Sequence, residues 1–214
     1  TLRRADEEND DKDDDKSKAP DPQSGEIAKA LFKSRTVLIF GEVDMKMAER
    51  VTAQLLAYAE SEGDIRVIVN SPGNPTGWTM TADEQRAVLE FARKRGLWIV
   101  ADEVYARLIY TRRPDGRQVA PSFLEIAGPD DPVLVLNSFS KPWAMTGWRL
   151  GWLTHPAALG DEIAKLVQIN TSGAPAFLQR GAIAALEKGD DFVAQMVERC
   201  RSGGELVFQR LSAL

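Results

Sequence analysis

The 214-residue sequence has few of the residues that build metal sites and disulfides. It contains one cysteine, Cys200, and one histidine, His155. A single cysteine excludes an internal disulfide, and a single histidine excludes a metal site built on several histidines. A Ser-His-Asp triad would depend wholly on His155, which directly precedes Pro156. The lack of a disulfide framework indicates a reducing compartment, so we expect the chain to be cytoplasmic.

Long apolar runs and dense basic clusters are also missing. No apolar stretch approaches the roughly 20 residues that a membrane span needs, and the first residues lack the apolar core of a signal peptide. The formal net charge is −5, from 27 Lys and Arg against 32 Asp and Glu. No stretch concentrates Lys and Arg as a nucleic-acid surface does. We therefore expect neither a nucleic acid nor a membrane as a partner.

Negative charge is concentrated at the amino terminus. Residues 1–24 hold nine Asp and Glu against five Lys and Arg, with few apolar side chains. Such a segment buries too little surface to offset the conformational entropy lost on ordering. We predict a disordered acidic tail over 1–24, and an acidic interaction arm is the alternative.

From Gly25 onward, short apolar runs alternate with helical patterns. The runs that predict strands are residues 37–40, 65–69, 97–101 and 133–136, with 148–153 as a further candidate. Strands that alternate with helices predict a parallel sheet. We expect an α/β fold with a three-layer, mostly parallel sheet that has helices on both faces.

The predicted helices carry recognisable end signals. Asp44 can cap a helix that follows it, Thr81 and Glu84 form a capping box, and Gly96 stands where a left-handed C-terminal cap belongs. Beyond Pro156 the pattern is helical, with expected breaks at residues 173–175, 189 and 203–204.

Polar side chains follow three of the predicted strands. Asn74, Asp102 and the segment 138–141 should meet at one edge, because ligands collect beyond the carboxyl ends of parallel strands. Lys141 stands among hydroxyl residues with Arg149 beyond it. An amine, hydroxyls and a guanidinium suit a phosphorylated aldehyde.

Each residue alone also has a simpler explanation. Lys141 could be a solvated loop lysine, Asp102 a helix N-cap, and residues 74–77 an ordinary turn. Three polar clusters at one sheet edge favour a binding site over three unrelated loops.

Three segments resemble the class I and II aminotransferases, which are pyridoxal 5'-phosphate (PLP) enzymes of fold-type I. They are Asn70-Ser-Pro-Gly-Asn-Pro-Thr-Gly77, Ala101-Asp-Glu-Val-Tyr105 and Ser138-Phe-Ser-Lys-Pro-Trp-Ala-Met-Thr-Gly-Trp-Arg-Leu-Gly151. The resemblance implies a partial aminotransferase core over residues 67–214. It also implies amino-group transfer between an amino acid and a 2-oxo acid, and a possible homodimer.

The resemblance also implies the roles of individual residues. Lys141 matches the lysine that forms the Schiff base and moves the proton at the substrate's alpha carbon. Asp102 matches the carboxylate at the pyridine nitrogen, and Tyr105 and Asn74 match the pair that binds the ring oxygen.

Three further residues match the phosphate ligands of the family, namely Ser138, Ser140 and Arg149. The family's stacking aromatic ring, its phosphate-binding helix and its substrate-binding arginine have no recognisable counterpart in this sequence. We therefore expect weak cofactor binding and impaired turnover.

Residues 25–73 resemble a different family, the proteolytic subunit of Clp-type ATP-dependent proteases. The matching pieces are Leu31-Phe-Lys-Ser-Arg-Thr-Val-Leu-Ile-Phe-Gly-Glu-Val43 and Asp64-Ile-Arg-Val-Ile-Val-Asn-Ser-Pro-Gly73. That family's second glycine after Ser-Pro is Asn74 here and no nucleophile segment follows, so we expect no serine peptidase activity. The two resemblances meet within 70–73, which predicts a chimera. A non-catalytic α/β module and a Clp-like assembly element remain alternatives to an aminotransferase.

Overall fold

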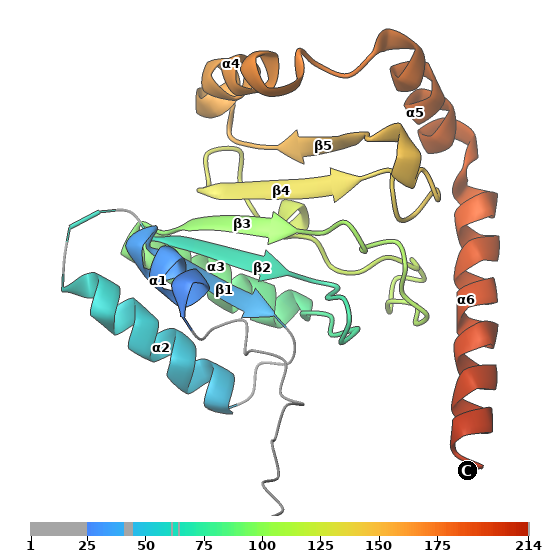
Figure 1. Ribbon diagram of the computed structural model, residues 1–214, viewed down its shortest axis with the longest axis horizontal. Helices are drawn as coiled ribbons and strands as arrows, with labels where there is room; N and C mark the ends of the chain where they lie inside the picture. The colour runs from blue at the N-terminus through green and yellow to red at the C-terminus, as the bar shows by residue number, and fades with distance from the viewer. Residues whose placement is uncertain (1–24, 41–44, 61, 64, 214) are drawn as a thin grey trace, which may run out of the picture.

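A computed structural model describes residues 25–40, 45–60, 62–63 and 65–213. The predicted tail over 1–24 and the Asp44 cap lie outside these residues. Five strands form one sheet in the order β1-β2-β3-β4-β5 (Figure 1). Strands β1 to β4 are parallel, and β5 runs antiparallel to β4. The expected mostly parallel α/β sheet is therefore confirmed.

The strands and helices have the following bounds. The strands are β1 (Thr36–Phe40), β2 (Arg66–Asn70), β3 (Trp98–Asp102), β4 (Val133–Ser138) and β5 (Gly151–Thr154). The α-helices are α1 (Glu26–Lys33), α2 (Met45–Ala59), α3 (Ala82–Arg95), α4 (Gly160–Thr171), α5 (Ala176–Lys188) and α6 (Asp190–Leu211). Short 3-10 helices are η1 (Phe123–Glu125), η2 (Thr146–Trp148) and η3 (Ala157–Leu159).

The main hydrophobic core lies on one face of the sheet. Val67 pairs in register with Val37 on one side and with Ile99 on the other, so their side chains point to the same face. These side chains are buried together with residues of α3 such as Leu89, and Val51 of α2 packs against them. Burying an aliphatic side chain stabilises a fold by about 1.5–3 kcal/mol, so this layer anchors the sheet.

The opposite face of the sheet is only partly covered by the described residues. Leu38, Ile68, Val100 and Leu134 are half-buried there, and Leu136 is 37% exposed. The second helical layer that the strand pattern predicts is correspondingly thin in this part of the chain.

Helix α3 begins and ends where the sequence predicts. The Thr81 hydroxyl accepts the Glu84 amide hydrogen at 3.2 Å, and the Glu84 carboxylate accepts from the Thr81 amide at 2.6 Å. Gly96 has a φ of 64°, in the left-handed region that glycine tolerates. The capping box and the glycine cap are both confirmed.

The expected helix break at Gly203–Gly204 is wrong, because α6 continues through both glycines to Leu211. A glycine pair costs a helix roughly 1–2 kcal/mol. Arg201 offsets part of this cost by pairing with Glu198 at 2.6 Å and with Glu205 at 2.7 Å, which spans the glycines.

The candidate strand over residues 148–153 begins later than expected, at Gly151. Trp148 ends a 3-10 helix, and Arg149 has a φ of 54°, which no strand residue adopts. A Cβ atom at position 151 would lie 2.7 Å from the Asn137 carbonyl oxygen. The close approach of β5 to β4 therefore requires glycine there.

Candidate active site

The carboxyl ends of the parallel strands bring Asp102 beside Asn70. Asn70 ends β2 and Asp102 ends β3, and the two residues are paired in register. The Asn70 side-chain amide donates to the Asp102 Oδ2 atom at 3.0 Å, and the Val104 amide donates to Oδ1 at 3.3 Å. Asp102 is half-buried and starts a turn rather than a helix, so it is not a helix N-cap. Two donors therefore fix the direction of this carboxylate.

A second polar pair lies in the loops that follow the same two strands. The Asn74 side-chain amide donates to the Tyr105 hydroxyl oxygen at 3.0 Å. Their positions are 31 residues apart in the chain. The fold therefore joins the two segments that the sequence marks as Asn74-Pro-Thr-Gly77 and Asp102-Glu-Val-Tyr105.

Lys141 comes from a third segment, the turn after β4. Its Nζ atom lies 5.5 Å from the centre of the Tyr105 ring. Within the described part of the chain, no carboxylate or hydrogen-bond acceptor contacts this half-buried amine. Lys141, Tyr105 and Asn74 thus form one chain of neighbours across three loops.

The turn that carries Lys141 is fixed at its base. Ser138 pairs with Gly151 across β4 and β5, and its hydroxyl donates to the Leu150 carbonyl at 3.3 Å. The same hydroxyl oxygen accepts the Ser140 amide hydrogen at 3.0 Å. Within the turn, Ala144 has a φ of 52°, a conformation that costs a non-glycine residue about 1–3 kcal/mol. Such strain is typical of a turn that surrounding contacts hold in one shape.

Arg149 is not brought into direct contact with the two serines. Its side chain is exposed, and its Nη1 atom donates to the Thr146 carbonyl at 3.0 Å. No hydrogen bond among the described residues joins Arg149 to Ser138 or Ser140.

A groove of about 450 Å³ adjoins the pair formed by Asn74 and Tyr105. Its other walls include Leu108, Tyr110 and, from α6, Val197. None of the described residues that line it is charged. An organic molecule held by Asn74 and Tyr105 would therefore extend into uncharged surroundings.

Comparison with known proteins shows where this arrangement belongs. The family model described as aminotransferase class I and II matches residues 19–214. The chain belongs to the class I and II aminotransferases. Enzymes of this family depend on PLP.

Relatives of this aminotransferase chain match over most of its length. It is 36% identical to the arginine–pyruvate transaminase AruH of Pseudomonas aeruginosa over 163 residues, which is 76% of this chain and 40% of the relative. It is 33% identical to an aspartate aminotransferase of Rhizobium meliloti over 172 residues, which is 80% of this chain and 41% of the relative. The chain thus spans about 40% of the length of these curated relatives.

Solved structures give the same result for the fold. The crystal structure of the aromatic aminotransferase from Pyrococcus horikoshii matches with a TM-score of 0.63 and 30% identity, over 76% of this chain and 42% of that one. An aspartate aminotransferase from Thermotoga maritima matches with a TM-score of 0.65 and 25% identity, over 86% of this chain and 54% of that one. The aminotransferase family model also spans residues 25–73, and none of these matches shows the Clp resemblance of that segment, which stays a prediction.

The side chains of this aminotransferase chain fit one half of PLP better than the other. A fixed carboxylate, an amide–phenol pair and an amine without a hydrogen-bond partner among the described residues suit the ring nitrogen, the ring oxygen and the aldehyde. At the phosphate end, the Ser138 hydroxyl already binds the Leu150 carbonyl and the Ser140 amide, and Arg149 donates to the Thr146 carbonyl of its own turn.

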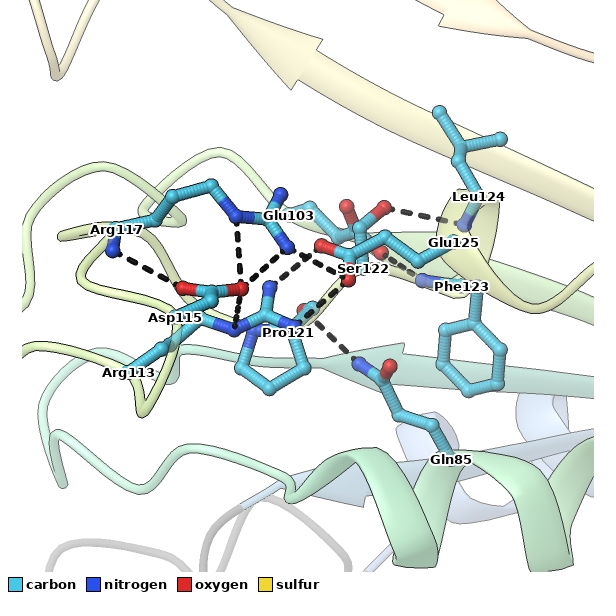
Figure 2. Close-up of polar contacts among 10 residues, drawn as sticks. All are labelled: Gln85, Glu103, Arg113, Asp115, Arg117, Pro121, Ser122, Phe123, Leu124 and Glu125. Carbon is cyan, nitrogen blue, oxygen red and sulfur yellow. Dashed lines mark hydrogen bonds and ion pairs between the residues drawn. The ribbon is translucent and has the colours of Figure 1, made fainter.

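Glu103, next to Asp102, has a different place in the structure. It is 3% exposed, and its Oε1 atom accepts the Phe123 amide hydrogen at 2.9 Å (Figure 2). Burial raises the pKa of the Glu103 carboxyl group above its ordinary value, although bonds from Ser122 and Phe123 oppose the rise. One acid of the Asp102-Glu103 pair therefore lies at the sheet edge and the other holds the long loop before β4.

Charged side chains fix the same loop on its outer side. Arg113 donates to both carboxylate oxygens of Glu125, at 2.6 and 2.8 Å, and Arg117 donates to Asp115 at 2.7 Å (Figure 2). The bond from Arg113 holds the pKa of Glu125 below its ordinary value. This network connects the loop to η1, which contributes the Phe123 amide to Glu103.

Asn70 is a residue that our sequence reasoning did not assign to the site. Its contact with Asp102 depends on the pairing of β2 with β3. In the sequence, Asn70 opens one of the segments that resemble the family, and both residues end apolar runs of similar length.

Proposed function

We propose that this chain carries the catalytic core of a PLP-dependent aminotransferase, which transfers an amino group between an amino acid and a 2-oxo acid. The observation that carries the proposal is the series Lys141, Tyr105 and Asn74, which lies beside Asp102 at one sheet edge in a chain of this family. PLP, when bound, supplies an electron sink for the electrons released at the substrate's alpha carbon.

Lys141 would supply the amine for the Schiff base with the aldehyde group of PLP. Its Nζ atom has no hydrogen-bond partner among the described residues and lies over the Tyr105 ring. The same amine would be able to hold or move the proton at the substrate's alpha carbon.

Asp102 would hold a proton on the pyridine nitrogen. Its carboxylate is oriented by Asn70 and by the Val104 amide, which makes Asn70 a positioning residue. Held in this direction, the carboxylate would be able to accept a hydrogen bond from a protonated ring nitrogen.

Tyr105 and Asn74 would hold the ring oxygen of the cofactor. The Tyr105 oxygen accepts a hydrogen bond from Asn74, which leaves the phenol proton to donate to the ring oxygen. Ser138, Ser140 and Arg149 would bind the phosphate, and Arg149 has donors besides the one that binds the Thr146 carbonyl.

The decisive experiment follows the visible absorbance that appears when PLP binds a lysine. We expect the unchanged protein to develop a visible absorbance band when it is mixed with PLP. The Lys141→Ala variant should show no such band. The control is Lys165→Ala, because Lys165 is an exposed lysine paired with Glu162 on α4. Borohydride should reduce the bond between PLP and the lysine to a stable one, and peptide mapping should then find the attached PLP group on Lys141. A band that persists in Lys141→Ala would contradict the assignment.

A non-catalytic α/β module is the alternative to an enzyme. A non-catalytic module would show no change in the absorbance of bound PLP when an amino acid is added. An aminotransferase would show one. A homodimer is the proposed active form, so light scattering at the protein concentration of that assay should give twice the mass of one chain.

We also infer from the sequence that residues 25–73 derive from a Clp-type protease subunit and were joined to the aminotransferase core at residues 70–73. Those residues begin with Asn70, the last residue of β2, which pairs with β1 on one side and β3 on the other. The proposed join can be tested by amplifying, from the source DNA, the coding sequence that spans residues 70–73. Two separate full-length genes with no continuous product would contradict a natural fusion.

A further inference from the structure

A second groove lies at the amino-terminal edge of the sheet. It has a volume of about 480 Å³ and is formed by α2, α3 and the turns that lead into β2 and β3. This volume lies within the range of small-molecule pockets. The strands are five residues long, so about 16 Å of sheet separates this groove from the Asp102 edge.

The walls of this groove are mainly apolar. They include Leu55 and Leu56 of α2, Phe91 of α3, and Leu97 just before β3. Leu56 is 65% exposed and Phe91 is 43% exposed, so both side chains present apolar surface that the described residues leave uncovered. A ligand of this groove must therefore carry an apolar part.

Tyr58 also lines the groove with its polar end already bonded. The residue is 2% exposed, and its hydroxyl lies 3.2 Å from the Leu31 carbonyl and 3.3 Å from the Thr36 carbonyl. Because that hydroxyl already has protein partners, Tyr58 mainly adds apolar ring surface.

Two arginines, Arg35 and Arg95, line the groove. The Arg35 Nη2 atom donates to the Tyr58 carbonyl at 2.7 Å, and its guanidinium lies 5.4 Å from the Tyr58 ring centre. The Arg95 guanidinium lies 5.7 Å from the Phe91 ring centre. No described carboxylate pairs with Arg95, and none of the described residues lining the groove is acidic.

We propose that this groove binds a small monocarboxylate with an apolar tail, such as a medium-chain fatty acid. The carboxylate binds at Arg95, beside Arg35, and the tail lies against Leu55, Leu56 and Phe91. Arg95 lies over the Phe91 ring and has no ion-pair partner among the described residues, so its donors can bind a carboxylate at little entropic cost. The apolar walls disfavour a nucleotide or free phosphate, which need polar contacts on every side.

Calorimetric titration of the full chain with octanoate tests the proposal, with octanol and octylamine as matched probes. We expect saturable binding of octanoate that weakens with salt, and much weaker binding of the other two. Arg95→Gln should weaken octanoate binding about tenfold or more, because a charged hydrogen bond is lost. Lys94→Gln is the control, since it removes the same charge at the next position, which does not line the groove.

A second variant keeps the test independent of Arg95. Thr52 is exposed on α2 and lines the groove, so Thr52→Trp should block binding while both arginines remain. Circular dichroism verifies that each variant is folded. Equal binding of octanol and octanoate, or equal losses in Arg95→Gln and Lys94→Gln, would overturn the proposal. PLP binding is read separately from its absorbance, so failure here leaves the aminotransferase proposal unaffected.

Discussion

At the scale of single residues, Asp102 and Glu103 show how position in the fold separates two adjacent acids. Asp102 is half-buried at the carboxyl edge of the sheet with Asn70 as a donor. Glu103 is buried and binds the Phe123 amide. The sequence predicts that this pair follows a strand. It does not predict which acid faces the site, because that depends on where the strand ends and the chain turns.

Glu103→Gln is expected to be at least as stable as the unchanged protein at neutral pH. Between the ordinary value of 4.5 and the raised pKa of the folded state, Glu103 holds a proton in the folded protein that it has lost in the unfolded protein. That contribution to stability is complete below the ordinary value of 4.5 and is lost as the pH rises through the folded pKa. Gln carries no charge, so its advantage should grow with pH in the same window.

Urea unfolding at several pH values measures this difference. Glu103→Ala is the contrasting variant, because it leaves the buried Phe123 amide without its acceptor. We expect Glu103→Ala to lose about 1–3 kcal/mol at every pH. A stability difference between Glu103→Gln and the unchanged protein that does not vary with pH would show that Glu103 stays ionised when folded.

At the scale of elements, α6 shows where local propensity gives the wrong answer. The pair Gly203–Gly204 predicts a break, yet the helix continues to Leu211. Val193 and Val197 are buried near its start and fix the helix to the rest of the chain. Arg201 and its two glutamates then support the turn that contains the glycines. The outcome depends on side-chain contacts over several turns, which a single dipeptide does not reveal.

Replacement of these glycines by alanine should stabilise the protein. Both positions are helical, and an added Cβ meets no atom within 4 Å at either one. Gly203→Ala and Gly204→Ala should each raise the free energy of unfolding by roughly 0.5–1 kcal/mol. Gly151→Ala is the opposite case, because its Cβ atom would collide with the Asn137 carbonyl. Thermal unfolding followed by circular dichroism should separate the three variants by sign.

At the scale of the whole molecule, one sheet unites residues 25–73 with the rest of the chain. Strand β2 pairs with β1 and with β3, and the buried core includes residues from both sides of this division. A second buried cluster joins the turn after β4 to α5 and α6. In the described helices, no segment is long and apolar enough to cross a membrane.

Asp131 links two elements of this sheet layer and should govern part of its acid stability. Its carboxylate accepts from Arg93 of α3 at 2.7 and 2.5 Å and from the Gly128 amide at 2.6 Å. The bonds from Arg93 lower the pKa of Asp131 below 3.8. Its contribution to stability is therefore present above that ordinary value and is lost as the pH falls through the lowered pKa.

Asp131→Asn should accordingly be less stable than the unchanged protein at pH 7, and the difference should shrink on acidification. Urea midpoints at pH 7 and near pH 3 measure it, with Asp130→Asn as the control at the neighbouring position. An undiminished difference near pH 3 would mean that the lost contacts of the side chain matter and its charge does not.

The sequence by itself determined the four parallel strands, the capped α3 helix and the segments that carry Asn74, Asp102, Tyr105 and Lys141. These features depend on short-range patterns of apolar side chains, caps and turn residues, which are local properties of the chain. Only the tertiary structure decided which of the segments touch.

The contacts of Asn70 with Asp102, of Asn74 with Tyr105 and of Lys141 with the Tyr105 ring all join residues that are at least 31 positions apart. They exist because parallel pairing places the carboxyl ends of β2, β3 and β4 at one edge. The groove between α2 and α3 likewise depends on the tertiary structure, because its two walls come from different segments of the chain. Which distant segments pack together depends on how the whole chain folds, so the pattern within one segment does not show which other segment it meets.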